Sequence, residues 1–217
     1  MADQKDITSE NAAAGSKTEE RKEMASAAKA LDQRNCPSGT RLKTIDMAYI
    51  ALFSVLIAIC SWISIQTTVP FTLQTMGVFL AVSILGGKRG TLSVLIYILM
   101  GAVGLPVFSG FTGGIGILLG NTGGYIIGFL FSALAMWGIE CAFGNGRVKR
   151  LISMLVGLLI CYAFGTVWFM AVYTRGSGPV SLLAVLGWCV FPFIIPDLVK
   201  IGIAFVISPR IRKHLVR

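Results

Sequence analysis

The sequence predicts an all-α integral membrane protein with six transmembrane helices and both termini in the cytoplasm. Three observations support this fold class. The 217-residue chain is 55% hydrophobic and only 13% charged, and its mean hydropathy is +0.77, whereas roughly a quarter of the residues of a soluble domain are charged. Several apolar runs are long enough to cross about 30 Å of hydrocarbon. The loops between these runs alternate between basic and uncharged.

The chain begins with a polar segment. Residues 1–43 carry eight basic and seven acidic residues and no long apolar run. Such a segment buries too little apolar surface to offset the entropy of ordering, so we expect a disordered N-terminal tail, and nothing in it resembles a signal peptide. The six-helix domain is expected over 44–208, followed by a basic cytoplasmic tail over 209–217.

Five apolar runs are long enough to span the bilayer, and a sixth, shorter run is counted because the loop charges require an even number. The connections "GGKRG" and "GNGRVKR" and the C-terminus are basic, whereas the other loops contain no charge or only Arg175. By the positive-inside rule the basic segments are cytoplasmic. The net charge of +9 is thus attributed to topology and to attraction for anionic lipid, without nucleic acid. The predicted spans are 45–65, 71–87, 91–108, 125–143, 151–173 and 182–207.

Several catalytic and metal-binding patterns are absent from the sequence. "GGKRGT" lacks the residue order of a Walker A phosphate loop, and there is no G-x-S-x-G or H-E-x-x-H pattern. The five cysteines show no C-x-x-C spacing. The one histidine, His214, lies in the basic tail away from any cysteine or carboxylate. We therefore expect no catalytic residue, metal site, cofactor or enzymatic activity.

Glycine is concentrated in the centre of the chain, with ten glycines between Gly101 and Gly128. Those at 116, 120, 124 and 128 recur every four residues, a spacing typical of close helix packing. "GNTGGY" also has the composition of a turn, so the region 105–125 is equally consistent with a re-entrant or capping loop over an outward-facing pocket.

Two opposite charges lie inside the last apolar run. Asp197 and Lys200 in "FIIPDLVK" are three residues apart and share one face of a helix. Each charge costs roughly 2.5 to 3.5 kcal/mol at the bilayer centre, which favours a functional site. Pro192 and Pro196 strengthen this interpretation, because they bend the helix beside the pair. In the alternative interpretation, Lys200 snorkels to the cytoplasmic interface and Asp197 only neutralises it.

The order of several motifs identifies a family. The run "VPFTLQTMGVFLAVSILGGKRGTLSVLIYILMGAVGLPVFSGFTGGIGILLGNTGGYIIGF" (69–129) and the later "PFIIPDLVK" closely resemble the BioY family, the biotin-specific S components of energy-coupling factor (ECF) transporters. The resemblance covers about 44–208. It implies a multi-pass protein of the bacterial cytoplasmic membrane that binds biotin from outside. It also implies a coupling protein and two ATPase subunits as partners, which fits the missing Walker A motif.

The resemblance implies that Asp197 and Lys200 hold biotin. A ureido ring offers N–H donors to a carboxylate and a carbonyl acceptor to an ammonium. The remaining candidates follow from position and chemistry alone. Many relatives have Pro where this chain has Asn121, so a less rigid loop is expected there. The candidates for apolar walls are Phe71, Tyr97, Phe108 and Tyr125, and the candidate polar partners are Gln74, Asn121 and Thr122.

A stripe of small residues on the first span suggests a contact with another helix. Ala51, Ser54 and Ala58 recur at three- and four-residue spacing, which lets helices approach closely. The family resemblance assigns this stripe to the coupling protein, and internal packing is the alternative.

Three other functions remain open at this point. An S component for another vitamin would have the same fold, because fold does not dictate ligand. A stand-alone secondary transporter would explain the proline-interrupted third and sixth spans. A membrane enzyme would have only Asp197 and Lys200 for its chemistry.

Overall fold

The structure, a computed structural model, describes residues 43–65, 71–144, 146–178 and 181–215. The chain divides into two units, 1–40 and 41–217, and the described residues belong to the second. The predicted disordered tail therefore lies outside the described residues, apart from Lys43. The elements are α2 (Thr44–Trp62), β1 (Ser64–Ile65), β2 (Phe71–Thr72), α3 (Gln74–Leu85), α4 (Gly87–Ala102), α5 (Ile115–Leu119), α6 (Gly123–Phe143), α7 (Arg147–Ser177), α8 (Leu182–Cys189) and α9 (Phe191–Leu215).

Glycines end three of the helices. Gly86, Gly144 and Gly178 follow α3, α6 and α7 with φ of 84°, 75° and 90°. This left-handed backbone conformation strains any residue with a Cβ, so glycine is the usual residue just after a helix. The chain can therefore reverse abruptly between α3 and α4 and between α6 and α7.

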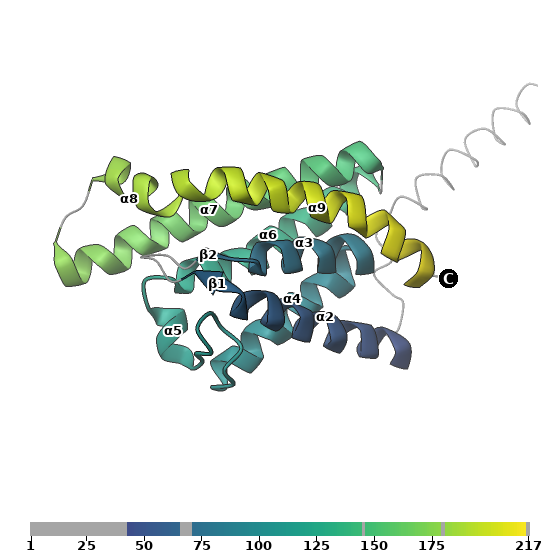
Figure 1. Ribbon diagram of the computed structural model, residues 1–217, viewed down its shortest axis with the longest axis horizontal. Helices are drawn as coiled ribbons and strands as arrows, with labels where there is room; N and C mark the ends of the chain where they lie inside the picture. Colours follow the sequence, from purple (N-terminus) through teal and green to yellow (C-terminus); the bar gives the residue numbers. More distant parts are fainter. Residues whose placement is uncertain (1–42, 66–70, 145, 179–180, 216–217) are drawn as a thin grey trace, which may run out of the picture. The chain divides into compact units, whose positions relative to one another are not determined.

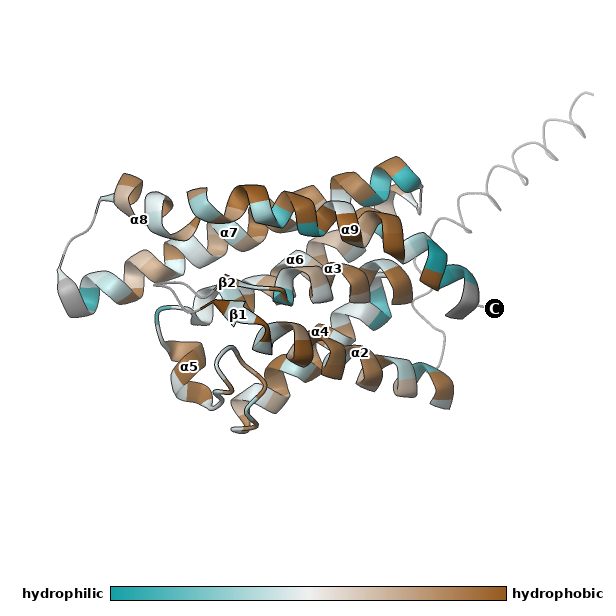
Figure 2. Cartoon of the chain, in the orientation of Figure 1, coloured by the Kyte–Doolittle hydropathy of each residue, from teal (hydrophilic) through white to brown (hydrophobic). Residues whose placement is uncertain are grey.

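Helix α3 is surrounded by its neighbours. Eleven of its 12 residues are buried, and it packs against α2, α4, α6 and α9. Helix α7 packs mainly on α6, and α9 lies along α3. Figure 2 shows the long helices to be largely apolar, with hydrophilic residues gathered toward the end where α9 finishes.

The bundle has two chemically different ends. The first, called the basic end, contains the start of α2, the α3–α4 and α6–α7 junctions and the end of α9. The other, called the loop end, contains β1, β2, α5, the segment 103–114, the end of α7 and the start of α8 (Figure 1). Strands β1 and β2 form a short antiparallel pair there, with Ser64 opposite Thr72.

Four of the described helices are long and apolar enough to cross a membrane, namely α2, α6, α7 and α9. The predicted second and third spans are shorter than expected, because α3 has 12 residues and α4 has 16, or about 18 and 24 Å at 1.5 Å per residue. The third span was predicted to reach 108, but α4 ends at Ala102. The sixth is interrupted at Val190, and α9 then continues through the predicted tail to Leu215.

The segment after α4 is a folded loop. Ser61 and Tyr97 donate hydrogen bonds to the carbonyl of Val107, at 2.8 and 3.2 Å. Trp62 donates to Pro106 O at 2.9 Å, and its ring stacks on Phe111 at 5.0 Å. The end of α2 and the interior of α4 therefore hold this loop against the bundle.

The glycine-rich centre contributes to helix packing in part. A Cβ at Gly124 would lie 2.2 Å from Trp168 Cβ, and one at Gly128 would lie 3.2 Å from Cys161 O, so these two glycines permit close packing of α6 on α7. A Cβ at Gly116 meets nothing within 4 Å among the described residues. The four regularly spaced glycines therefore do not belong to one helix. Only the last two, Gly124 and Gly128, lie in α6 and permit close helix packing.

Candidate functional site

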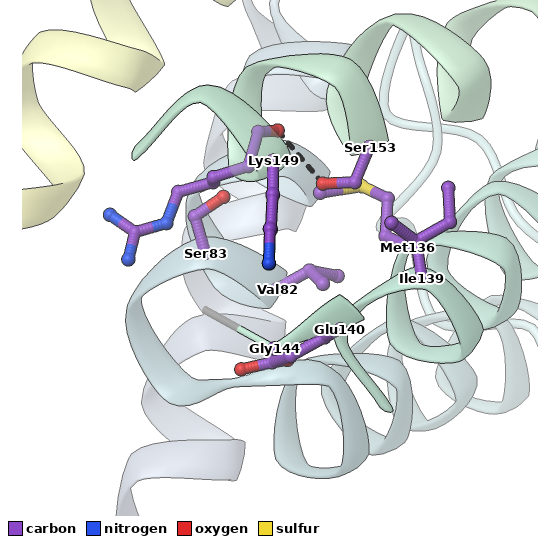
Figure 3. A pocket seen from close by; sticks show the side chains of 9 residues that line it. Val82, Ser83, Met136, Ile139, Glu140, Gly144, Lys149 and Ser153 are labelled. Carbon is purple, nitrogen blue, oxygen red and sulfur yellow. Dashed lines mark hydrogen bonds between the residues drawn. The ribbon is translucent and has the colours of Figure 1, made fainter. Parts of the chain in front are cut away.

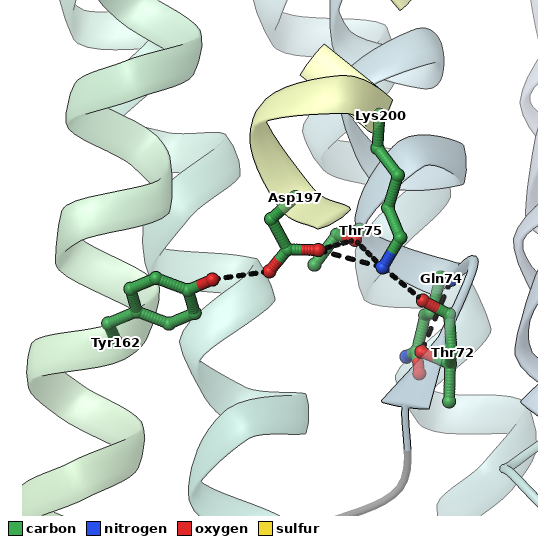
Figure 4. A network of polar contacts seen from close by, with 6 residues as sticks. All are labelled: Thr72, Gln74, Thr75, Tyr162, Asp197 and Lys200. Carbon is green, nitrogen blue, oxygen red and sulfur yellow. Dashed lines mark hydrogen bonds and ion pairs between the residues drawn. The ribbon is translucent and has the colours of Figure 1, made fainter. Parts of the chain in front are cut away.

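The two charges of α9 form a buried ion pair. Lys200 Nζ lies 2.7 Å from Asp197 Oδ1, and the two side chains are 5% and 3% exposed. Because Cβ atoms of a helix point toward its N-terminus, both side chains extend toward the loop end and reach β2 and α3 (Figure 4).

The ammonium of Lys200 has acceptors for all three of its protons. It donates to Thr72 O at 2.6 Å, to Thr75 Oγ1 at 3.3 Å and to Asp197 Oδ1 at 2.7 Å. It also lies 4.1 Å from the centroid of the Phe71 ring, within the range of a cation–π interaction. The side chain thus turns away from the basic end, and the snorkelling interpretation of Lys200 was wrong.

The carboxylate of Asp197 is held from two further helices. Thr75 of α3 donates to Oδ1 at 3.1 Å, and Tyr162 of α7 donates to Oδ2 at 2.5 Å. Hydrogen bonds to a charged group are about twice as strong as neutral ones. The sequence analysis missed Thr72, Thr75 and Tyr162, and no local spacing indicates them, because they lie 35 to 128 residues from their partners on α9.

Two cavities adjoin this network on the side of the loop end. The smaller, of about 50 Å³, is lined by Asp197, Lys200, Tyr162 and Thr75 together with Cys161, Cys189 and Phe193. The larger, of about 130 Å³, is lined by Gln74, Phe108, Ser109, Thr112, Ile117, Thr122 and Ile126. Thr72, Tyr125 and Phe129 line both. The two cavities are adjacent, since they share these three lining residues, and the loop 103–114 contributes Phe108, Ser109 and Thr112 to the wall of the larger one.

The structure brings six of the nine predicted ligand-binding residues to these cavities. Asp197 and Lys200 line the smaller cavity, Gln74, Phe108 and Thr122 line the larger, and Tyr125 lines both. The remaining three occupy different positions.

Phe71 and Tyr97 are not among the residues that line either cavity, but they contact residues that do. Phe71 contacts Lys200 and stacks on Phe193 at 5.9 Å. Tyr97 is fully buried, accepts a hydrogen bond from Gln74 Nε2 at 3.0 Å and packs edge-on against Phe108. Asn121 is exposed and is not among the residues that line either cavity. The sequence correctly placed the segment around Asn121, but the side chain facing inward is that of its neighbour Thr122.

The stripe on α2 divides between the interior and the surface. Ser54 and Ala58 are buried, and the one hydroxyl proton of Ser54 has two carbonyl acceptors within reach, Ile50 O at 2.8 Å and Ser93 O at 2.9 Å. Internal packing, the alternative interpretation, therefore accounts for Ser54 and Ala58. Ala51 is exposed and remains available to a partner helix.

The described residues contain no group of three His, Cys, Asp or Glu side chains arranged to hold a metal ion. A carboxylate and an ammonium face a hollow whose far side is aromatic and aliphatic, which suits a small ligand with a polar, hydrogen-bonding head and an apolar body.

Comparisons with known proteins agree on one family. The model of the BioY family matches residues 32–217. A probable biotin transporter BioY of Pyrococcus horikoshii is 41% identical over 172 residues, which cover 79% of this chain and 98% of the relative. The biotin transporter BioY of Thermotoga maritima is 39% identical over 163 residues, covering 75% and 92%. A crystal structure of the S-component for biotin from an ECF-type ABC transporter matches with a TM-score of 0.67 at 30% identity, covering 77% of this chain and 90% of that one.

Proposed function

This chain belongs to the BioY family, and we propose that it takes up biotin as the substrate-binding S component of an ECF-type transporter. The observation that carries the proposal is the buried Asp197–Lys200 pair beside two adjacent cavities, in a membrane protein whose relatives are biotin transporters. As a component of a transporter, the chain would bind the substrate, and we assign no enzymatic activity to it.

The polar network can accept a ureido group with little rearrangement. A carboxylate has about four acceptor positions, and Asp197 uses three within the described part of the chain, for Thr75, Lys200 and Tyr162. One position remains for a ligand N–H. Lys200 must exchange one acceptor for the ligand carbonyl, and the longest of its three hydrogen bonds, to Thr75 at 3.3 Å, is the one we expect to break. The larger cavity, with Phe108, Ile126 and Phe129, then surrounds the apolar rings and tail.

The direct test is the ligand that the protein retains. We expect the full chain, extracted in detergent and purified, to release biotin on denaturation, identified by mass spectrometry, and to bind added biotin in preference to riboflavin and thiamin. Preferential binding of either of the other vitamins would assign the chain to a different S component. Biotin uptake by vesicles that contain this chain but no ATPase module would instead support a stand-alone transporter.

The proposal includes a topology of six spans, with both ends of the chain in the cytoplasm of a bacterial cell. The six are α2, α3, α4, α6, α7 and α9, with α3 sheltered by its neighbours. Val103 at the loop end and Val148 at the basic end are both strongly exposed. In a cysteine-free background, Val103→Cys is expected to react with an impermeant thiol reagent added to intact cells. Labelling of Val148→Cys under the same conditions would contradict this orientation.

The proposed partners are one transmembrane coupling protein and two ATPase subunits. On α2 we now assign the contact to the exposed face that contains Ala51, since Ser54 and Ala58 are buried. Ala51→Trp is expected to reduce co-purification with the coupling module while leaving biotin binding unchanged. Normal co-purification of that variant would place the interface on another helix.

A further inference from the structure

A pocket at the basic end has a chemistry unlike that of the biotin site. It lies between α3, α6 and α7 and is lined by Ser83, Glu140, Lys149, Arg150 and Ser153, among others (Figure 3). Ser83 is eight residues beyond Thr75 on α3, or about 12 Å along the axis. The pocket is therefore separate from the Asp197–Lys200 network and takes no part in the function proposed above.

The charge around this pocket is strongly positive. The described residues of the basic end contain nine Lys and Arg side chains and two carboxylates, Asp46 and Glu140. Asp46 is paired with Arg89 at 3.0 Å, and Glu140 Oε2 accepts the N–H of Gly87 at 2.5 Å, at the start of α4. Glu140 also lines the pocket and attracts Arg150, so one carboxylate faces the cations of α7 and α9, which outnumber it.

Two cations of α7 line this pocket. Arg150 is half-buried, and its charge is attracted by Glu140 and repelled by Arg212 of α9. Lys149 Nζ donates a hydrogen bond of 2.5 Å to Phe143 O. One carboxylate thus faces two cations of the pocket lining, and a bound anion would complete the neutralisation.

A buried hydroxyl provides independent evidence for a ligand. Ser83 is 4% exposed and lines the pocket, and its Oγ has no hydrogen-bond partner among the described residues. Leaving a buried polar atom without a partner costs free energy, and a small ligand or ion bound beside it would remove that cost. Figure 3 shows Ser83, Lys149 and Glu140 surrounding the same hollow from three different helices.

We propose that this pocket binds the phosphate of an anionic lipid headgroup, with Arg150 and Lys149 beside the phosphate. The cavity measures about 20 Å³, which is room for about one water. The phosphate therefore lies at the mouth, and one of its oxygens, or a water that it holds, reaches Ser83 Oγ. Basic pockets between transmembrane helices are known to hold such headgroups, and a lipid phosphate, unlike a soluble anion, is supplied at the level of a helix end.

The test measures thermal unfolding of the full chain in detergent with added phosphatidylglycerol, phosphatidylcholine or inorganic phosphate. Phosphatidylglycerol is expected to raise the midpoint of thermal unfolding until the effect saturates, whereas phosphatidylcholine and inorganic phosphate are expected to leave it unchanged. Arg150→Gln is expected to raise the half-saturating concentration of phosphatidylglycerol about fivefold. Arg147→Gln is the matched control, because Arg147 is exposed, belongs to the same turn and does not line the pocket; its value is expected to stay within about twofold of the wild type.

Ser83→Ala separates lipid binding from folding. Because the hydroxyl has no partner in the described part of the chain, its loss is expected to leave the lipid-free midpoint unchanged or higher, while lipid binding weakens. Equal effects of Arg147→Gln and Arg150→Gln would overturn the proposal in favour of diffuse charge. An equal shift of the midpoint with inorganic phosphate would overturn the lipid assignment. If Ser83→Ala responded to phosphatidylglycerol as the wild type does, the pocket would not be part of the lipid site.

Discussion

Two ion pairs with similar geometry lie in different parts of the bundle. Lys200 and Asp197 are 2.7 Å apart with side chains 5% and 3% exposed, whereas Arg89 and Asp46 are 3.0 Å apart with side chains 33% and 8% exposed. The first pair lies between helices beside two cavities, and the second joins α2 to α4 at the basic end. Nearly equal distances therefore accompany very different surroundings.

The difference in burial predicts different energetic roles for the two ion pairs. The desolvation of a buried pair is offset only when further hydrogen bonds satisfy both charges. Asp197 and Lys200 have such bonds from Thr72, Thr75 and Tyr162. In the Arg89–Asp46 pair, called the surface pair, Asp46 is buried but Arg89 is 33% exposed, so their attraction is partly screened and contributes less. We therefore expect substitutions in the buried pair to affect both stability and biotin binding, and substitutions in the surface pair to affect neither strongly.

The largest effect is expected when one member of the buried pair is removed. Asp197→Asn or Lys200→Met leaves the other charge buried without its partner, at a cost of about 3 to 5 kcal/mol of stability. Each change also removes a ligand hydrogen bond of about 1.5 to 3 kcal/mol, so biotin should bind about ten- to a hundredfold more weakly. Titration with biotin, alongside size-exclusion profiles and thermal unfolding, measures both effects.

The double variant Asp197→Asn with Lys200→Met is the control for this prediction. It removes both charges, so much of the stability should return while the affinity for biotin stays low. Near-native affinity in a well-folded double variant would mean that the pair is structural, and the comparison between the two ion pairs would then concern stability alone.

An intermediate effect is expected at Tyr162, whose hydroxyl donates to Asp197. Tyr162→Phe removes one hydrogen bond to a charge and should destabilise the protein by about 1.5 to 3 kcal/mol. The same substitution in the double variant should cost less, because the acceptor is no longer charged. A double-mutant cycle of thermal or denaturant unfolding gives this difference. An equal cost in both backgrounds would show that Tyr162 contributes by packing and not through the carboxylate.

The smallest effect is expected in the surface pair. Asp46→Asn keeps an acceptor for the N–H of Lys43, which now donates to Asp46 Oδ2 at 3.2 Å, and loses only the partly screened attraction to Arg89. The change should cost less than about 1 kcal/mol, and less still at high salt. Biotin affinity should not change. A loss of affinity comparable to that of Asp197→Asn would mean that the basic end is coupled to the cavities.

The amino-acid sequence alone was enough to identify the class, the family and the buried pair. Composition requires a bilayer, and the order of "PFTLQT", "GLPVF", "TGGY" and "PFIIPDLVK" was specific enough for the family, which the comparisons confirm. Asp197 and Lys200 were found because a spacing of three residues on one helix is a local property. Gln74, Phe108, Thr122 and Tyr125, which lie in the same run of motifs, line the larger cavity, and their role in binding stays a prediction.

Only the tertiary structure decided which side chains complete the site and which face of each helix is buried. Thr72, Thr75 and Tyr162 reach the pair from distant segments, and no periodicity within one helix reports a contact across 35 or 128 residues. Ser54 and Ala51 have the same small-residue character, yet one is buried and the other exposed. In an apolar helix the lipid-facing and protein-facing sides are equally hydrophobic, so the sequence carries no signal that separates them, and packing against neighbouring helices determines the outcome.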